Sequence, residues 1–258
     1  MNYKLQIDPR GMATVSMNRP ELHNAFNDEM ISELIACFHE LSNNDLVKIV
    51  VLTGIGKSFC AGADLNWMKR MKDYSYEENL KDTQNLAELF TVINKFKKPT
   101  IARVNGSALG GGAGLLACCD YVIAVDTALI GFTEVRLGLV PAVISPFVIA
   151  KIGESHARAT FLSGVRFDCN RAMRMGLIHQ ISSFDKLDED LEVCINDFLQ
   201  AAPKAAGTAK ELISKVIQFN SLEEARLYTC ETISKVRTAE EGQEGMKALL
   251  EKRKASWL

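Results

Sequence analysis

Short β-branched runs alternate with helical patterns over the first half of the chain, from Tyr3 to about Val125. The runs at 3–7 and 12–18 predict a hairpin through Asp8–Gly11. Three later apolar runs, at 48–54, 99–106 and 121–125, predict further strands. A sheet whose strands alternate with crossover helices is typical of the α/β class.

Two segments between these strands carry apolar residues at helical spacing, which predicts helices over 28–43 and 75–96. Their predicted buried stripes consist of Met30, Leu34, Cys37 and Leu41 in the first, and of Leu86, Phe90 and Ile93 in the second. After about Glu154 the strand signal is weak and nearly every segment favours helix. We therefore expect a core over 1–195 and a C-terminal helical region over 196–258.

Composition excludes several functions. A net charge of −2 gives no electrostatic reason to expect nucleic acid or an anionic membrane as partner. No apolar stretch approaches the roughly 20 residues that span a bilayer, and no basic-then-apolar leader is present, so a cytoplasmic location is expected. Seven cysteines without CxxC spacing are expected to be reduced packing residues, and four histidines without ligand spacing predict no metal site.

The segment "NGSALGGGAGLLACCD", residues 105–120, places five glycines directly after a predicted strand. Glycines there form a tight turn, allow close helix packing, or present bare N–H groups to a ligand. The dinucleotide pattern GxGxxG fails because Leu115 replaces its third glycine, and Walker A fails because Val51 replaces its first. No GxSxG elbow of a serine hydrolase occurs either.

A second segment, "VVLTGIGKSFCAGADLNWM", repeats this order of a strand, small residues and a helical pattern. N–H groups from two such junctions could converge on one oxygen atom. Paired backbone donors of this kind form an oxyanion hole, which stabilises the enolate of a thioester. The alternative is that both junctions are tight packing turns.

Three ordered motifs, "FCAGADL", the glycine segment above and "GFTEVRLGLVPA", resemble the enoyl-CoA hydratase/isomerase (crotonase) superfamily. The resemblance covers the chain from "NRPELHNAFN" to "EGMKALLEKRKASW". It implies a spiral of ββα units with a C-terminal helical trimerisation region, and a trimer or dimer of trimers. It also implies an acyl-CoA thioester substrate, in which coenzyme A is part of the substrate and no separate cofactor is needed.

The resemblance also implies roles for individual residues. Ala63 and Gly111 match the oxyanion positions through their backbone N–H groups, and Glu134 matches one of two catalytic glutamates. Trp67, Met68 and residues 140–147 would line the acyl pocket, or belong to ordinary core. The residues expected to bind substrate or CoA are Leu22, His23, Asn24, Ala61, Gly62, Asp64, Leu65, Trp67, Gly110 and Gly114.

The chief departure from the family pattern is Gly114, which stands where the other glutamate would be. The runs "FCAGADLNWMKRM" and "EVRLGLVPAVISPFVIAKIGE" resemble bacterial methylglutaconyl-CoA hydratases of leucine breakdown, which implies that this glycine is a trait of that subgroup. A branched substrate would then fill the space left by Gly114, and Lys69, Arg70 or Arg136 would bind its distal carboxylate.

Three functions stay open from the sequence. The first is hydration of a branched 2-enoyl-CoA with Glu134 as general base. The second is double-bond isomerisation, in which one carboxylate moves a proton between two carbons. The third is a non-catalytic acyl-CoA-binding or interaction protein, against which the retained Glu134 and the intact oxyanion motifs argue.

Overall fold

The computed structural model describes residues 1–258, and it divides into two units. The first unit contains residues 1–96 and 100–192, and the second contains residues 97–99 and 193–258. The division falls between Glu192 and Val193, whereas the sequence predicts a boundary after residue 195.

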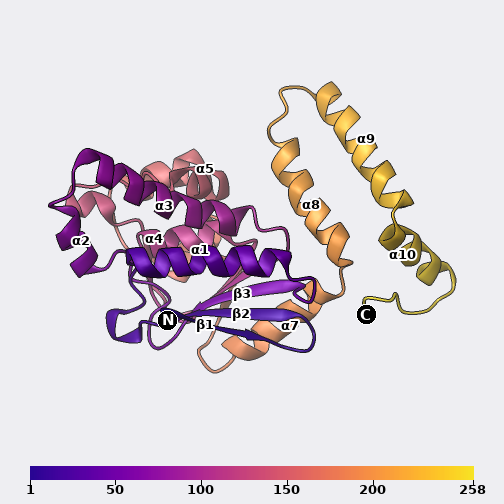
Figure 1. The fold of residues 1–258 in the computed structure, drawn as a ribbon, viewed down its shortest axis with the longest axis horizontal. Helices are drawn as coiled ribbons and strands as arrows, with labels where there is room; N and C mark the ends of the chain where they lie inside the picture. The colour runs from indigo at the N-terminus through magenta and orange to yellow at the C-terminus, as the bar shows by residue number, and fades with distance from the viewer. The chain divides into compact units, whose positions relative to one another are not determined.

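A six-stranded sheet of the order β1-β2-β3-β4-β6-β8 forms the centre of the first unit (Figure 1). The predicted hairpin is confirmed, because the first two strands pair antiparallel with Tyr3 opposite Met17. All other neighbours pair in parallel. The strands are β1 (Tyr3–Ile7), β2 (Met12–Met17), β3 (Ile49–Gly54), β4 (Thr100–Val104), β6 (Tyr121–Val125) and β8 (Gln180–Ser182).

Two long helices lie on one side of this sheet, α1 (Asp28–Asn43) and α3 (Tyr76–Asn94) (Figure 1). The stripe predicted for α1 is confirmed, since its four residues are all buried. The stripe predicted for α3 is wrong in one residue: Leu89 is buried beside Phe90 and Ile93, while Leu86 is half-buried.

Shorter elements build the junctions that follow the strands. A second, two-stranded parallel sheet joins β5 (Ala108–Leu109) to β7 (Ile130–Gly131). Its first strand lies inside the glycine segment, where no strand was predicted. The remaining elements of this unit are η1 (Pro20–Leu22), α2 (Leu65–Met71), α4 (Gly111–Cys118), η2 (Glu134–Leu137), α5 (Ser145–Phe161) and α6 (Cys169–Arg174).

The second unit is helical, and α7 (Leu187–Leu199) runs from the first unit into it. It contains α8 (Pro203–Val216), α9 (Leu222–Thr238) and α10 (Glu240–Leu250). The indole of Trp257 donates to the carbonyl of Gln200 at 3.3 Å, which holds the end of the chain within this unit. No residue of α8 or α9 is fully buried.

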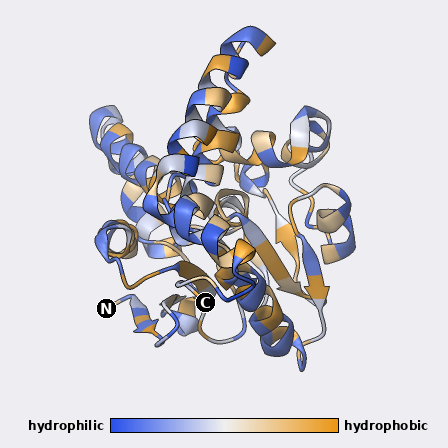
Figure 2. Cartoon of the chain, turned by 90° about the vertical axis from the view of Figure 1, so that its right-hand side faces the viewer, coloured by the Kyte–Doolittle hydropathy of each residue, from blue (hydrophilic) through white to orange (hydrophobic).

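Hydrophobic side chains concentrate in the strands of the sheet, which are largely orange in Figure 2. All seven cysteines are free thiols, as expected, and six are buried. The expectation of a packing role is wrong for Cys230, which is exposed on α9. None of the helices combines the length and the apolar character that crossing a membrane requires.

Candidate active site

Backbone hydrogen bonds tie the two small-residue junctions to a third segment of the first unit. The N–H of Leu109 donates to the carbonyl of Cys60 at 2.9 Å. On its other side, β5 pairs with β7, and the N–H of Gly110 donates to the carbonyl of Gly131 at 2.8 Å. The loop after β3, the glycine segment and the residues before Glu134 are therefore held together by main-chain contacts.

The two predicted oxyanion donors lie in this frame with unused N–H groups. Ala63 pairs with Phe26 in a short parallel bridge. The two hydrogen bonds of this bridge run from the N–H of Phe26 to the carbonyl of Gly62 and from the N–H of Asp64 to the carbonyl of Phe26. The N–H of Ala63 takes part in neither bond and has no acceptor in the chain. Gly111 is the first residue of α4, where helical N–H groups lack intrahelical partners.

The two junctions are also close in space. A methyl group built on Gly62 would lie 3.9 Å from the Cα atom of Gly110, so the residues that follow each glycine, Ala63 and Gly111, belong to one small region. The positive end of the α4 dipole lies at the same place and favours negative charge there. This arrangement can stabilise an oxyanion.

Glu134 brings a carboxylate to the same region. Glu134 is the first residue of η2, a few residues after the end of β7. Its Oε1 would lie 3.3 Å from a methyl group built on Gly110. Its Oε2 is buried and accepts no hydrogen bond from the chain. Burial raises the pKa of Glu134, with a smaller opposing effect from a backbone hydrogen bond within the same residue.

The segments expected to line CoA, 22–24 and 61–65, lie side by side. The N–H of Ala61 donates to the carbonyl of His23 at 3.0 Å. Asn24 is fully buried, and its side-chain amide donates to the carbonyls of Ile55 and Ser58 at 3.0 and 2.8 Å. Leu22 stays partly exposed at the end of η1. Binding of CoA along these segments remains a prediction.

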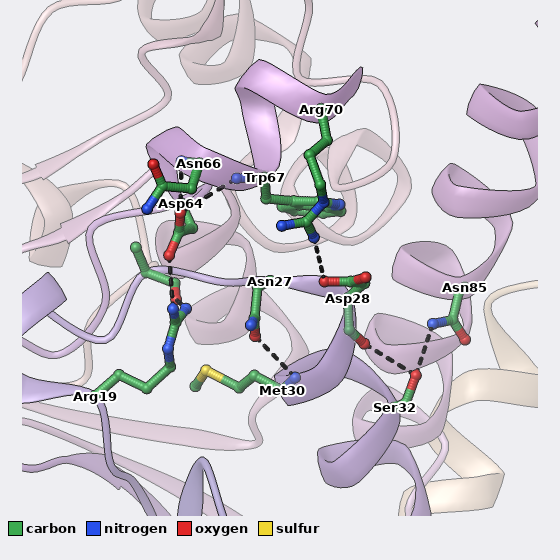
Figure 3. A network of polar contacts seen from close by, with 11 residues as sticks. Arg19, Asn27, Asp28, Met30, Ser32, Asp64, Asn66, Trp67, Arg70 and Asn85 are labelled. Atoms are coloured by element: carbon green, nitrogen blue, oxygen red, sulfur yellow. Dashed lines mark hydrogen bonds and ion pairs between the residues drawn. The ribbon is translucent and has the colours of Figure 1, made fainter. Parts of the chain in front are cut away.

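The side chain of Asp64 belongs to the fold (Figure 3). It caps α2 by accepting from the N–H groups of Asn66 and Trp67, and it forms an ion pair with Arg19 at 2.6 Å. These donors hold the pKa of Asp64 below its usual range, although burial alone would raise it. The backbone of Asp64 is bonded as well, because its N–H donates to the carbonyl of Phe26 at 2.7 Å and its carbonyl accepts from the N–H of Met68 at 2.9 Å. Its neighbour Leu65 is exposed.

Trp67 is 2% exposed, which favours the core alternative for its indole ring.

Two of the three cations predicted to bind the distal carboxylate of the substrate already have partners in the chain. Arg70 pairs with Asp28 at 2.7 Å (Figure 3). Arg136 packs against Gly164, and its Nε donates to the carbonyl of Ser163 at 3.4 Å.

The expectation that Gly114 leaves open space is wrong. A methyl group built on Gly114 would lie 2.9 Å from Cβ of Ile144 and 3.1 Å from a ring carbon of Phe90, with Cγ2 of Ile144 closer still. Carbon atoms without a bond between them prefer separations of about 3.5–4.0 Å. The Ile144 side chain can therefore pack here only because position 114 is a glycine and has no side chain.

Other contributors to the site were missed from the sequence. Gly112 lies against Cys60, and a methyl group built on it would be 2.8 Å from Cβ of Cys60. Phe26 and Phe90 pack beside Gly111. The triple glycine was a usable signal for close backbone approach, whereas no sequence pattern connected Phe26, far along the chain, with this helix.

Two N–H groups without acceptors in the chain thus lie near a carboxylate whose Oε2 is buried and accepts no hydrogen bond, an arrangement typical of oxyanion-hole enzymes. A family model described as "Enoyl-CoA hydratase/isomerase" matches residues 8–258. The chain belongs to this family, within the crotonase superfamily, and is an enzyme of that class.

Individual relatives agree with this assignment. The "Short-chain-enoyl-CoA hydratase" of Clostridium acetobutylicum is 31% identical over 245 residues, which cover 94% of this chain and 92% of the relative. The crystal structure of an enoyl-CoA hydratase from Shewanella pealeana has a TM-score of 0.96 and 38% identity, covering 100% of this chain and 96% of the other. That of Mycobacterium smegmatis has a TM-score of 0.93 and 28% identity, covering 100% and 99%.

Proposed function

We propose that the enzyme hydrates a branched 2-enoyl-CoA, similar to 3-methylglutaconyl-CoA, with Glu134 as its only acid/base group. The observation that carries this proposal is the buried Oε2 of Glu134, which accepts no hydrogen bond from the chain beside the two free N–H groups. A single-carboxylate mechanism is also supported at Gly114, because the atoms nearest to a methyl group built there belong to the apolar side chains of Ile144 and Phe90.

The proposed reaction proceeds through an enolate. Ionised Glu134 takes a proton from a water molecule while the water oxygen forms a bond to C3 of the enoyl group. The π electrons move to the thioester oxygen, where the N–H groups of Ala63 and Gly111 stabilise the negative charge. Glu134 then returns its proton to C2, which restores the carboxylate and the carbonyl.

Double-bond isomerisation is the second candidate. It needs no water: Glu134 would take a proton from one carbon of a 3-enoyl-CoA and return it to another, through the same dienolate oxygen. The absence of a carboxylate at position 114 supports this reaction as well. The two reactions are therefore distinguished by which enoyl-CoA substrate the enzyme turns over.

The distal carboxylate of a 3-methylglutaconyl group would need a cation. Arg70 and Arg136 are already held by Asp28 and by Ser163. Lys69, exposed on α2, is therefore the strongest of the three candidates.

The deciding experiment compares turnover of 3-methylglutaconyl-CoA, crotonyl-CoA and a 3-enoyl-CoA by the wild type. We expect fastest hydration of the branched substrate, and a raised KM for that substrate alone in Lys69→Gln, with Arg70→Gln and Arg136→Gln as matched comparisons. Turnover of the 3-enoyl-CoA alone would make the enzyme an isomerase. Tight binding without turnover would favour the non-catalytic alternative and contradict the proposal.

Exposed apolar side chains of the second unit support the trimer or dimer of trimers that the family resemblance implies. The helices of the second unit expose large apolar side chains, which in soluble proteins often mark contact with another chain. They include Ile213, Ile217, Leu222, Leu227, Leu249 and Leu250. Light scattering on the purified chain is expected to give three or six times the chain's mass of 28.5 kDa. A monomer would contradict the assignment.

A further inference from the structure

The side chain of Arg19 joins the segment of the predicted oxyanion donor Ala63 to the segment that pairs with it. Its Nη2 donates to Oδ2 of Asp64, the residue after Ala63, at 2.6 Å (Figure 3). Its Nη1 donates to the carbonyl of Ala25 at 2.5 Å, next to the bridge residue Phe26. The Arg19 side chain is 13% exposed, so both bonds are largely shielded from water. One guanidinium thus holds both segments.

Two peptide groups connect this guanidinium to the N–H of Ala63. Every peptide bond of the chain is trans, so the C=O and the N–H of one peptide group point in opposite directions. The group that joins Ala25 to Phe26 accepts from Arg19 through its C=O. Its N–H donates to the carbonyl of Gly62 at 2.6 Å. That carbonyl shares a peptide group with the N–H of Ala63, so a series of two hydrogen bonds from Arg19 sets the direction of this N–H.

The first peptide group of this series is firmly held. Ala25 is 6% exposed and Phe26 is 1% exposed. Arg19 and the fully buried Asn24 bond to each other in both directions, from the N–H of Arg19 to Oδ1 of Asn24 and from the N–H of Asn24 to the carbonyl of Arg19, each at 2.9 Å. Away from water, a hydrogen bond from a charged donor is strong and polarises the bonds that continue from it. A guanidinium at the start of such a series makes the last N–H a better donor.

Arg19 also offsets a negative charge beside the oxyanion position. Asp64 follows Ala63 directly in the chain. Its carboxylate accepts from two backbone N–H groups of α2 as well as from Arg19, and these donors favour the ionised form. A negative charge there opposes the charge that develops on a thioester oxygen bound at Ala63, because like charges repel. The ion pair with Arg19 reduces this repulsion.

We propose that Arg19 is a positioning residue of the oxyanion hole: it directs and polarises the N–H of Ala63 through two peptide groups and offsets the charge of Asp64. The inference rests on the proposed role of Ala63 as an oxyanion donor. It requires both arms of the guanidinium, because one arm bonds the peptide group and the other bonds the carboxylate. The effect belongs in kcat rather than in KM, since an oxyanion donor acts most strongly where charge develops in the transition state.

The test compares Arg19→Gln and Arg19→Lys with the wild type, on whichever of the three enoyl-CoA substrates above is turned over fastest. We expect kcat to fall about tenfold in Arg19→Gln with KM nearly unchanged, which is less than the loss of about 10²–10³-fold on removing an oxyanion donor outright. Lysine keeps the charge but offers one nitrogen in place of a fork. Arg19→Lys should therefore recover part of the urea midpoint through Asp64 while kcat stays low, and it tests the proposal if the glutamine variant does not fold.

Arg103→Gln is the matched control. Arg103 is also largely buried, with 21% of its side chain exposed, and it pairs with Asp188 at 2.7 Å on β4. Its loss should leave kcat unchanged. A wild-type kcat in Arg19→Lys would overturn the inference, because the bond to Ala25 would then be dispensable. A raised KM with an unchanged kcat in Arg19→Gln would overturn it as well.

A readout without turnover distinguishes this inference from the proposed function. Hydrogen bonds to a thioester carbonyl lower its stretching frequency, which infrared spectra report for bound butyryl-CoA labelled at its carbonyl carbon. We expect a higher frequency in both Arg19 variants than in the wild type and in Arg103→Gln. An unchanged frequency would overturn the inference and leave the proposed function intact. A wild type that shows the lowered frequency but turns over none of the three substrates would overturn the proposed function alone, and a wild-type frequency equal to that in water would overturn both.

Discussion

Replacing Glu134 by glutamine is expected to lower kcat/KM by about 10²–10⁴-fold, which is the usual contribution of a positioned acid/base group. Glutamine keeps the shape of the side chain beside Gly110 but cannot accept the proton of water. Hydration assays on the two proteins check this result. Glu154→Gln, on the exposed face of α5, is the control and should retain full activity.

The same substitution also predicts a pH dependence. Burial raises the pKa of Glu134, and the proposed base is the ionised form. Activity should therefore fall as the pH drops through this raised pKa, at a higher pH than for an ordinary glutamate, and the variant should lack this limb. Because the pKa of Glu134 is higher in the folded than in the unfolded protein, its contribution to stability is lost as the pH rises and the buried carboxyl ionises. Glutamine stays neutral, so at neutral pH the Glu134→Gln variant should unfold at a higher urea concentration than the wild type. Full activity, or lower stability, would argue against a buried base.

Gly112→Ala is expected to have the second largest effect. The added methyl would lie 2.8 Å from Cβ and 3.0 Å from the carbonyl carbon of Cys60, with the carbonyl oxygen closer. Cys60 cannot retreat freely, because its carbonyl accepts from Leu109 and its N–H donates to Ser107. Such overpacking costs about 1–3 kcal/mol of stability, and a shift of the oxyanion donors by about 1 Å can cost about 10²-fold in rate.

Gly153→Ala is the control that distinguishes a loss of stability from a loss of rate. Gly153 has a φ of +73° and a ψ of 162°, with no atom within 4 Å of an added methyl, so alanine there introduces only backbone strain, of about 1–3 kcal/mol. We expect lower stability with an unchanged rate in Gly153→Ala, and losses of both in Gly112→Ala. Urea unfolding and kcat measured on both proteins decide this, and equal rates would show that the donors tolerate movement.

Long, strongly patterned elements were predictable from the sequence. The predicted bounds of α1 match the structure, because its apolar stripe repeats over four turns and Asn27 caps its start. The three-residue β8 was missed because it is too short to show alternation. For the same reason the sequence did not reveal β5 and β7, each of which has two residues.

The candidate site was predictable where function depends on the backbone. The glycines and small residues around Ala63 and Gly111 marked both junctions, and the structure brings them together with Glu134. The filling of the space at Gly114 was not predictable, because it depends on which side chain of a distant segment packs there. The sequence pattern shows that the family's glutamate is absent at position 114, but not that Ile144 occupies the space of its side chain.

The small sheet of β5 and β7 has a consequence for how this enzyme can change over generations. Main-chain hydrogen bonds from Leu109 to Cys60 and from Gly110 to Gly131 set the spacing between the oxyanion donors and the segment that carries Glu134. Main-chain bonds survive most amino-acid replacements, so drift in the flanking side chains leaves this spacing intact. Substitutions in those side chains are therefore expected to change which acyl group is accepted without changing this main-chain spacing.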